Sequence, residues 1–295
     1  MLNPKTPCSV VYFLAGSLPG SAILHLRQLS LFGMITRLKG SILFNHAENI
    51  FKSITVAKSS WFHQIRRWCI MYDLPHPLDL MSAALNKQAF KTLIKKKVVT
   101  YWETTLREEA DGLVSLSAFK SSYMSLTKTH PLWSTAGYSP VQVSMATIQA
   151  TMLSGRYRTE ALLKYWSSSN KRGICLLSRE CSDTIDSVCH ILCSCPGLQS
   201  VRENLLIYTS KFIARLPPPH ANVISKLCHP TNEKLCEFLL DCSSSPDVII
   251  LVQHFGQEIL QEFFSLTRTW VFVLHRERLR LLGRWRRPGN CNKFV

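Results

Sequence analysis

The sequence predicts an all-α protein, and three observations lead to that class. Apolar residues recur at steps of three and four, most clearly in residues 89–110, AFKTLIKKKVVTYWETTLREEA, and this spacing places them along one face of a helix. The period-two alternation of a half-buried strand is scarce. Turn-forming clusters separate the periodic segments; they are GSLPG, DLPHPLD, THPLWSTAGYSP, SSSNKRG, RLPPPH and SSSPD.

The periodic segments define the expected helices in chain order. The N-terminal apolar run CSVVYFLAGSLPGSAILHL continues its pattern into Leu29, Leu31 and Phe32, so we interpret it as helix and not as a signal peptide. In the helix around residues 89–110, Glu103 lies four residues before Arg107, which is a favourable helix pair. The other segments expected to be helical are 21–38, 44–71, 140–153, 157–168, 200–214, 231–241 and 247–282.

Two of the turn clusters predict domain boundaries. STAGYSP (134–140) ends a first helical block of a usual domain size, and LPPPH (216–220) separates a cysteine-rich segment from a C-terminal helical extension. The expected parts are therefore residues 1–135, 136–215 and 216–295.

Composition narrows the class of function. Hydrophobic residues make up 46% of the chain and the mean hydropathy is +0.04, so we expect a substantial core and no intrinsic disorder. Lys and Arg outnumber Asp and Glu by 35 to 19, and the resulting charge of +16 favours a polyanionic partner, most simply RNA or DNA. A basic protein without such a partner is the plainer alternative.

We expect no membrane span, because a spanning helix needs about 18 or more uninterrupted apolar residues. The most apolar candidate, VIILVQHFGQEILQEFF (248–264), is interrupted by polar residues and is interpreted as a buried or partner-facing helix. The eleven cysteines are odd in number and spread over a long chain, which favours a reducing compartment, nucleus or cytoplasm, over a disulfide framework.

Residues 173–198, GICLLSRECSDTIDSVCHILCSCPGL, gather five cysteines and one histidine. A structural zinc site needs four such ligands around a tetrahedral centre. The assignment that fits takes Cys175 and Cys181 from a loop, and His190 and Cys195 from a helix that begins near Ser182 and is capped by Ser182 or Asp183.

Two alternatives stay open for this cluster. Cys189 and Cys193 are four residues apart on the same expected helix and could serve as ligands instead. The second alternative is that the cysteines bind no metal, since buried cysteines often act only as small apolar residues in a reduced core. The spacer between Cys175 and Cys181, which is longer than the usual two to four residues, leaves this alternative open.

Several stretches, taken in order, resemble one family. They are YFLAGSLPGSAILHLRQLSLFGMI (12–35), SSWFHQIRRWCIMYDLPHPL (59–78), FKTLIKKKVVTYWETTLREEA (90–110), THPLW (129–133), LSGRYRTEALLKYW (153–166) and the C…C…H…CP order of 175–196. Over roughly residues 11–205 the chain resembles the C-terminal portion of the reverse transcriptase polyprotein of non-LTR retrotransposons, downstream of the polymerase palm.

This resemblance implies a multi-helix thumb-like block, a small CCHC zinc-knuckle-like segment and a C-terminal helical extension. In such elements this tail helps to hold template RNA and target DNA during target-primed reverse transcription. Carried over by position, the ligands of one structural zinc ion are Cys175, Cys181, His190 and Cys195. The chain departs from the pattern in a first spacer that is one residue longer and in Cys189, which stands where an acidic residue often precedes the histidine.

The carboxylates of a polymerase are missing from this chain. Polymerisation in this family uses two divalent ions held by a Tyr-x-Asp-Asp hairpin and a further Asp, whereas none of the seven aspartates here is adjacent to another. We therefore expect a nucleic-acid-binding fragment with no enzymatic activity of its own and no small-molecule substrate. A helical protein–protein interaction scaffold and a non-functional element remnant are the alternatives.

Three basic stretches are candidates for nucleic-acid contact, since backbone binding needs a stripe of cations with aromatic faces nearby. The first joins Lys91, Lys95, Lys96 and Lys97 with Tyr101 and Trp102, although these aromatics also fit the apolar face. The second, which leads into the cysteine-rich segment and is favoured, follows a glycine expected to open the next helix; it contains Arg156, Tyr157, Arg158, Lys164, Lys171 and Arg172. The third is the arginine-rich tail 276–287. A solvated charged face is the plainer reading of each, and the tail could equally be a nuclear-import patch.

Overall fold

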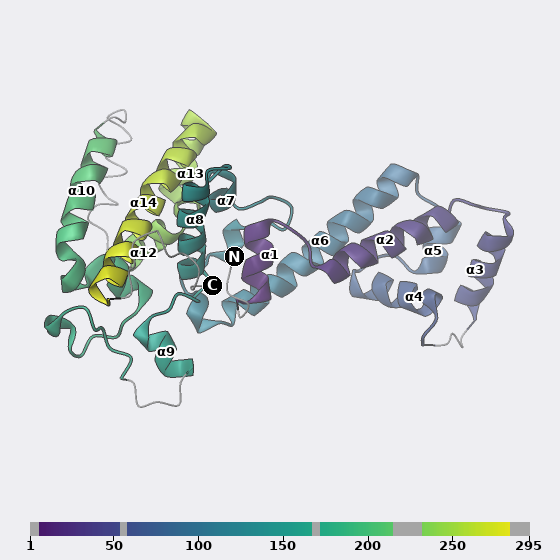
Figure 1. The fold of residues 1–295 in the computed structure, drawn as a ribbon. Helices are drawn as coiled ribbons and strands as arrows, with labels where there is room; N and C mark the ends of the chain where they lie inside the picture. The colour runs from purple at the N-terminus through teal and green to yellow at the C-terminus, as the bar shows by residue number, and fades with distance from the viewer. Residues whose placement is uncertain (1–5, 54–57, 167–171, 215–231, 284–295) are drawn as a thin grey trace. The chain divides into compact units, whose positions relative to one another are not determined.

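The structure is a computed structural model that describes residues 6–53, 58–166, 172–214 and 232–283 (Figure 1). These residues are mostly helical and contain no strand. Their single β pairing is an isolated antiparallel bridge between Ile174 and Ile185. The predicted all-α class is confirmed for this part of the chain.

The chain divides into two compact units. The smaller unit comprises Ala15–Glu109 with Ser125–Lys128, and the larger unit comprises Met1–Leu14, Ala110–Met124 and Thr129–Val295. The boundary expected near residue 135 falls inside the larger unit, and the one expected at LPPPH (216–220) lies outside the described residues. The three-part division therefore stays a prediction.

The smaller unit is a helical block around an aromatic and aliphatic core. Its helices are α2 (Gly20–Ile35), α3 (Ile42–Lys52), α4 (Trp61–Met71), α5 (Pro77–Ser82) and most of α6 (Lys87–Asp111). Phe32, Ile65, Phe90 and Val98 are each at most 2% exposed in this core. Gly33 lets α2 approach Phe90 of α6 closely, because a Cβ atom there would lie 2.3 Å from the Phe90 ring.

Residues 44–71, expected as one helix, form two. The extended backbone of Ser53 ends α3, and Ser60 begins α4 by accepting a hydrogen bond from the Phe62 amide at 3.3 Å. Serine side chains bond to nearby backbone groups and so favour helix ends over helix interiors. Ser53 and Ser60 therefore suit the positions at which α3 ends and α4 begins.

The larger unit packs around one long helix, α14 (Gln257–Leu281), which lies against α8, α10, α12 and α13. Its helices and short turns, in order, are α1 (Cys8–Ala15), η1 (Val114–Leu116), η2 (Ser121–Tyr123), α7 (Pro131–Ser134), α8 (Pro140–Leu153), α9 (Glu160–Trp166), η3 (Arg179–Cys181), η4 (His190–Ser194), η5 (Pro196–Leu198), α10 (Gln199–Ile213), α12 (Asn232–Leu240), η6 (Cys242–Ser244), α13 (Pro246–Phe255) and α14. The segment expected as one helix over 247–282 is split at Gly256, whose φ of +78° lies in the left-handed region that favours glycine.

The N-terminal apolar run is also interrupted, contrary to the expected continuous helix. Gly16, with a φ of +62°, follows α1, and Pro19 immediately precedes α2. Among the described helices, none alone is long and apolar enough to cross a membrane; α1 and α2 reach that length and composition only when they are counted together across their break.

Gly155 was expected to open the next helix, but it lies at the end of α8 instead. Its φ is +65°, and a Cβ atom at this position would lie 2.2 Å from the carbonyl oxygen of Ser115. Glycine is therefore required at this helix end both for its backbone conformation and for space. The next helix, α9, begins at Glu160.

Candidate metal centre

The first half of the cysteine-rich segment is a loop that folds back on itself. The Cys175 amide donates to the Thr184 carbonyl at 2.9 Å, and the Asp186 amide donates to the Gly173 carbonyl at 3.0 Å. Between the residues joined by these two hydrogen bonds the chain makes the turn η3, in which the Ser178 hydroxyl accepts a hydrogen bond from the Glu180 amide. Cys175 and Cys181 thus lie on a loop, as the sequence predicts.

The second half contains a helical turn that begins later than expected. The predicted start near Ser182 is wrong, because the backbone groups of Thr184 and Asp186 are used in the pairing with Gly173 and Cys175. The turn begins at Val188, and its cap is Ser187, whose hydroxyl accepts from the His190 amide at 3.1 Å.

The residues His190–Ser194 form a single π turn, η4. It closes with a hydrogen bond of 2.8 Å from the Cys195 amide to the His190 carbonyl, five residues back. This wider turn lets side chains five residues apart project to the same side, which an ordinary α-helical turn would not allow. His190 and Cys195 therefore approach the loop cysteines together.

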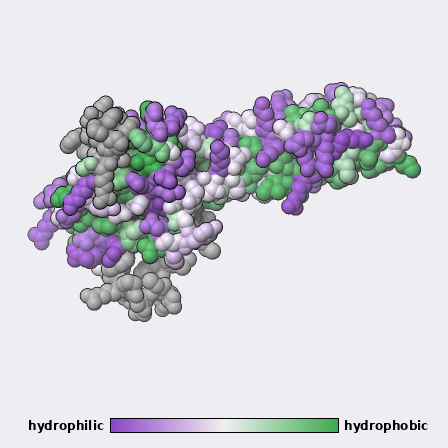
Figure 2. Space-filling view, turned by 90° about the horizontal axis from the view of Figure 1, so that it is seen from above, coloured by the Kyte–Doolittle hydropathy of each residue, from purple (hydrophilic) through white to green (hydrophobic). Residues whose placement is uncertain are grey.

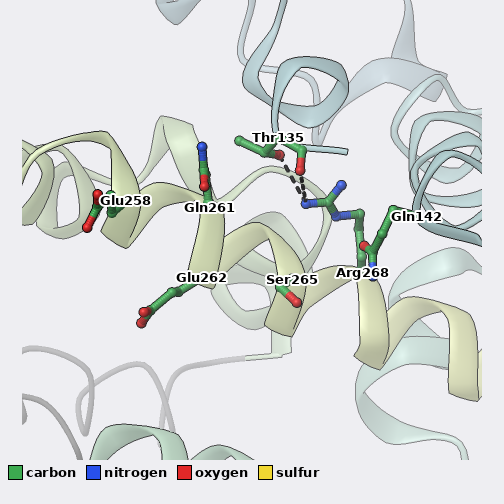
Figure 3. Close-up of a pocket in the computed structure, with 7 residues that line it drawn as sticks. All are labelled: Thr135, Gln142, Glu258, Gln261, Glu262, Ser265 and Arg268. Atoms are coloured by element: carbon green, nitrogen blue, oxygen red, sulfur yellow. Dashed lines mark hydrogen bonds between the residues drawn. The ribbon is translucent and has the colours of Figure 1, made fainter. Parts of the chain in front are cut away.

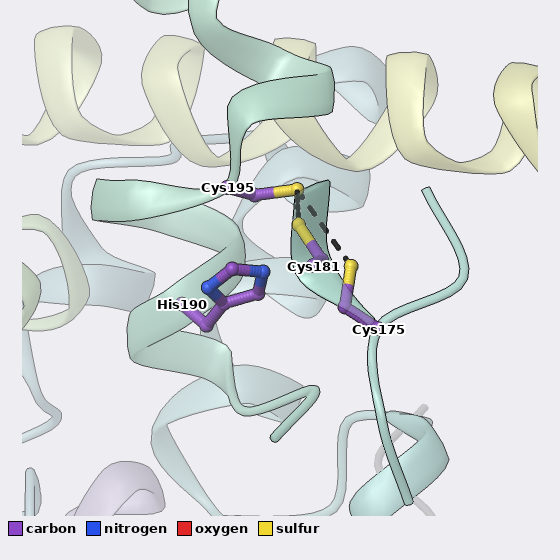
Figure 4. A group of neighbouring side chains, drawn as sticks. All are labelled: Cys175, Cys181, His190 and Cys195. Carbon is purple, nitrogen blue, oxygen red and sulfur yellow. Dashed lines mark hydrogen bonds between the residues drawn. The ribbon is translucent and has the colours of Figure 1, made fainter. Parts of the chain in front are cut away.

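The four predicted ligands meet in one place. One ligand atom from each of Cys175, Cys181, His190 and Cys195 lies within 4.8 Å of all the others, and the side chains converge in Figure 4. The Sγ atoms of Cys175 and Cys195 are 3.7 Å apart, and those of Cys181 and Cys195 are 4.0 Å apart. We call these four residues the first metal group.

These distances suit a tetrahedral metal ion. Metal–sulfur bonds of about 2.3 Å at the tetrahedral angle place two sulfurs about 3.8 Å apart, whereas a disulfide would bring them to about 2.0 Å. The observed separations match the first geometry, and none of these cysteines is in a disulfide.

The environment of the His190 side chain suits a metal ligand. Its side chain is buried, Nδ1 lies 3.2 Å from the Ser194 hydroxyl, and the buried Nε2 has no hydrogen-bond partner among the described groups. A buried polar atom without a partner costs about 1–3 kcal/mol. Burial also lowers the pKa of His190, against the opposing charge of Asp186, so the ring is held in the neutral form that binds metals.

The surroundings of the thiols also suit a bound cation. The Leu177 amide donates to Cys175 Sγ at 3.5 Å, and the buried guanidinium of Arg202 donates to the Cys195 carbonyl. Burial, and after it the neighbouring Cys175, raises the pKa of Cys195 to about 12, because a buried thiolate loses its hydration and is repelled by the charge of a second thiolate. A bound cation would offset both effects. A divalent ion with three thiolates carries one net negative charge, which Arg202 is placed to balance. The cluster can therefore hold a metal ion.

Cys189 and Cys193, the alternative ligands, do not join the first metal group. They belong to a second group with Cys236 of α12, and one sulfur from each lies within 4.8 Å of the other two. The sequence reasoning missed Cys236, because it lies in another helix and no local spacing connects it to the cysteine-rich segment.

A buried ion pair ties the loop to α14. Asp186 Oδ2 lies 2.8 Å from the Arg278 guanidinium, and both side chains are at most 3% exposed. The same oxygen accepts from the Glu160 amide at 2.6 Å, and Arg278 also donates to the Arg158 carbonyl. Arg278 was expected in a solvent-facing basic tail; that placement is wrong, because its charge is used inside the protein. Residues 284–287 of that tail lie outside the described residues.

The first basic stretch lies on α6. Lys91, Lys95 and Lys96 are exposed, while Lys97 is partly exposed and is paired with Asp73. Tyr101 and Trp102 pack against the core of the smaller unit, and the Trp102 indole donates to the Tyr72 hydroxyl at 3.2 Å. These two rings therefore follow the plainer reading, in which they belong to the apolar face.

The second basic stretch is only partly at the surface. Arg158, Lys164 and Arg172 are exposed and Arg156 is half-buried, while Lys171 lies outside the described residues. Tyr157 is 6% exposed; its hydroxyl lies 2.8 Å from His275 Nδ1, and the Arg278 guanidinium covers its ring. In this structure the Tyr157 ring serves packing against α14 and is not presented to a base.

A polar cavity of about 470 Å³ lies beside α14 (Figure 3). It is lined by Thr135, Gln142, Glu258, Gln261, Glu262, Ser265 and Arg268. The Arg268 guanidinium is held by the Thr135 carbonyl and hydroxyl at 3.2 and 3.1 Å. The lining carries no cysteine or histidine, and its one cation is engaged by the protein itself, so we assign no chemistry to this cavity.

Comparisons of the chain with protein-family models, with curated proteins and with solved structures find no match. The resemblance to non-LTR retrotransposon reverse transcriptases therefore stays a prediction from the sequence.

Proposed function

We propose that this chain is a nucleic-acid-binding protein, the C-terminal part of a non-LTR retrotransposon reverse transcriptase, whose larger unit is organised by one structural zinc ion. The observation that carries the proposal is the convergence of four ligand atoms within 4.8 Å, one of them offered by a histidine whose buried Nε2 has no partner among the described groups. No catalytic role is assigned to the ion.

Zinc is the metal that this ligand set favours. Three thiolates and one imidazole at tetrahedral spacing are typical of closed structural zinc sites, whereas catalytic sites keep one position open for water. The ion would join the loop that carries Cys175 and Cys181 to the turn that carries His190 and Cys195. It would thereby fix the start of α10 and the loop that reaches Arg278.

The nucleic-acid half of the proposal rests on charge. The chain carries a formal charge of +16, and Arg158, Lys164 and Arg172 are exposed in the segment that leads into the first metal group. On the face of the smaller unit that Figure 2 shows, at the right, hydrophilic and apolar side chains alternate. In the same unit α6 exposes Lys91, Lys95 and Lys96. Such cations bind phosphates without reading sequence.

Binding to single-stranded RNA and DNA, measured by fluorescence anisotropy between 50 and 200 mM salt, tests this half. We expect the logarithm of the binding constant to fall linearly with the logarithm of the salt concentration, by about 0.7 for each phosphate contact. The variant Arg158→Gln, Lys164→Gln, Arg172→Gln should lower that slope by about 2. The control variant Lys39→Gln, Lys58→Gln, Lys128→Gln removes the same charge from other exposed positions and should lower it less.

Two outcomes would contradict the proposal. Binding that does not change with salt would exclude phosphate contacts as its source, and an equal loss in both triple variants would mean that only net charge matters and that the segment 156–172 is no contact surface.

A protein–protein interaction scaffold is the second candidate, and α2 gives it some support. This helix exposes four large apolar side chains at 42–52%, namely Ile23, Leu24, Leu31 and Met34. The helix first considered as partner-facing is a weaker candidate, because Val248, Leu251 and Phe263 are buried in the core of the larger unit. Self-association that persists at high salt and is lost in Leu24→Ser with Leu31→Ser would favour the scaffold.

A further inference from the structure

The turn η4 and its flanking residues carry two sets of ligands, of which the first metal group uses only one. His190 and Cys195 belong to that group, whereas Cys189 and Cys193 belong to a separate cluster with Cys236 of α12. Helix α12 packs directly against η4. Residues that alternate along one short turn are therefore divided between two partners, the folded-back loop and α12.

The second cluster is compact and built entirely of sulfur. One Sγ atom from each of Cys189, Cys193 and Cys236 lies within 4.8 Å of the other two. Two of these cysteines come from one turn and the third from a helix that follows it by about 40 residues in the chain. This is the arrangement by which metal sites join separate elements.

We propose that Cys189, Cys193 and Cys236 form a second metal site, which holds a thiophilic cation such as Zn²⁺ through three thiolate sulfurs. This site is distinct from the proposed structural zinc and does not depend on it. Each thiol that binds the ion gives its proton to solvent, so no oxidant or reductant is needed.

Soft ligands and partial exposure indicate which ions the site would take. Thiolate sulfur selects zinc and monovalent copper over the hard cations magnesium and calcium. Cys236 is 6% exposed, whereas Cys189 and Cys193 are half-buried, so an ion can enter from the side of η4. Three protein ligands leave a fourth zinc position for water or an added ligand, unlike the closed set of the first metal group.

The consequence for the fold is a cross-link that the first group cannot provide. The first metal group joins residues 175–195 only to one another, whereas the second would fix α12, and with it the start of the α12–α14 region, to the cysteine-rich segment. Metal binding would then couple the C-terminal helices to the proposed zinc centre.

Native mass spectrometry of the full chain, reduced and supplied with zinc, tests the proposal. The wild type should carry two zinc ions per chain. Cys236→Ser and Cys189→Ser should each carry one, and Cys181→Ser should carry one through loss of the other site. Cys8→Ser is the matched control: it removes an exposed cysteine outside both groups and should keep two. Circular dichroism shows whether each variant is folded, and the half-buried Cys189 is the milder site if Cys236→Ser unfolds.

The outcomes separate the two sites. One zinc in the wild type that survives Cys236→Ser and Cys189→Ser but not Cys181→Ser overturns the second site and leaves the proposed function intact. One zinc that survives Cys181→Ser but not Cys236→Ser keeps the second site and overturns the first. Two zinc ions in every folded variant would overturn the second site. So would the absence of the second zinc ion together with a protein mass lower by two hydrogen atoms, which marks a disulfide.

Discussion

The two units of this chain are stabilised by different physics. Of the buried polar side chains among the described residues, one, Thr36, belongs to the smaller unit. The larger unit buries many more, among them Asp186, His190, Arg202 and Arg278. The smaller unit therefore depends on the removal of apolar surface from water, which is non-directional. The larger unit depends on polar partners that must be present and correctly placed, which makes it sensitive to single changes in charge, protonation and metal content.

The difference between the units is tested by destabilising each one by a similar free energy, the smaller unit through its apolar core and the larger unit through a buried ion pair. Phe90→Ala removes a ring that is 2% exposed in the core of the smaller unit and should lower its free energy of unfolding by about 3–5 kcal/mol. The metal content should stay that of the wild type. Metal loss in this variant would mean that the units are not independent in stability.

In the larger unit, Asp186→Asn should lower the free energy of unfolding by about 3–5 kcal/mol, because it leaves the Arg278 guanidinium buried without its carboxylate. Urea unfolding measures the change. The double variant Asp186→Asn with Arg278→Met removes both charges and should cost clearly less than the sum of the two single variants. An additive double variant would contradict the assignment of this pair as a coupled buried contact.

The pH dependence of the larger unit sharpens the comparison further. Burial, with the nearby charge of Arg278, lowers the pKa of His275 to about 4, and its Nδ1 lies 2.8 Å from the Tyr157 hydroxyl. A folded-state pKa below the unfolded value of about 6.5 gives stability that is present above pH 6.5 and is lost as the pH falls toward 4. We expect a loss of up to about 3 kcal/mol over this window.

His275→Gln is the variant that checks this pH dependence, since glutamine does not titrate. Its free energy of unfolding, measured by urea titration at several pH values, should be flatter between pH 6.5 and 4 than that of the wild type. Equal slopes for the two proteins would exclude His275 as the source.

A smaller effect separates backbone strain from crowding. Gly155 and Gly137 both have positive φ values, but only at Gly155 would a Cβ atom meet backbone, the Ser115 carbonyl at 2.2 Å. Gly137→Ala should cost about 1 kcal/mol from conformation alone, and Gly155→Ala about 2–3 kcal/mol because Ser115 must also move. Thermal unfolding of the two variants measures the difference, and equal costs would mean that the contact at Ser115 relaxes freely.

The smallest effect on stability is expected at the surface of α6. Lys91→Gln with Lys95→Gln and Lys96→Gln changes three exposed side chains and should alter the free energy of unfolding by less than about 0.5 kcal/mol. If α6 contacts nucleic acid, the same variant should lower the salt slope of RNA binding by up to about 2. An unchanged slope would assign these lysines to a solvated face.

The sequence predicted the helical class and brought out the four residues of the first metal group. The spacing of apolar residues and the identity of metal-ligating residues are local features, so both can be recognised in one sequence without the structure. The start of the helical turn at Val188, with Ser187 as its cap, was not predictable from local capping, because the backbone pairing of Gly173 and Cys175 with residues 184–186 decides it. The five-residue closure from His190 to Cys195 likewise has no pattern of its own.

Long-range contacts account for the remaining differences. In the sequence Arg278 is one cation of a basic tail, and only the structure shows its partner Asp186. Likewise, Tyr157 is an aromatic residue beside arginines in the sequence, and only the structure shows that Arg278 of α14 covers its ring. Cys236 becomes a candidate ligand only because α12 packs against η4 and brings it near Cys189 and Cys193. In each case the side chain is placed by a residue more than 40 positions away in the chain, which spacing along the sequence cannot express.

The measurement that tests the central claim most directly is the metal content of the purified, folded chain, by native mass spectrometry, in the wild type, in Cys181→Ser and in His190→Ala. The account predicts that zinc is present in the wild type and that each substitution removes one ion per chain and destabilises the larger unit. Zinc absent from the wild type, with both variants as stable as the parent, would contradict it and leave these cysteines as core residues.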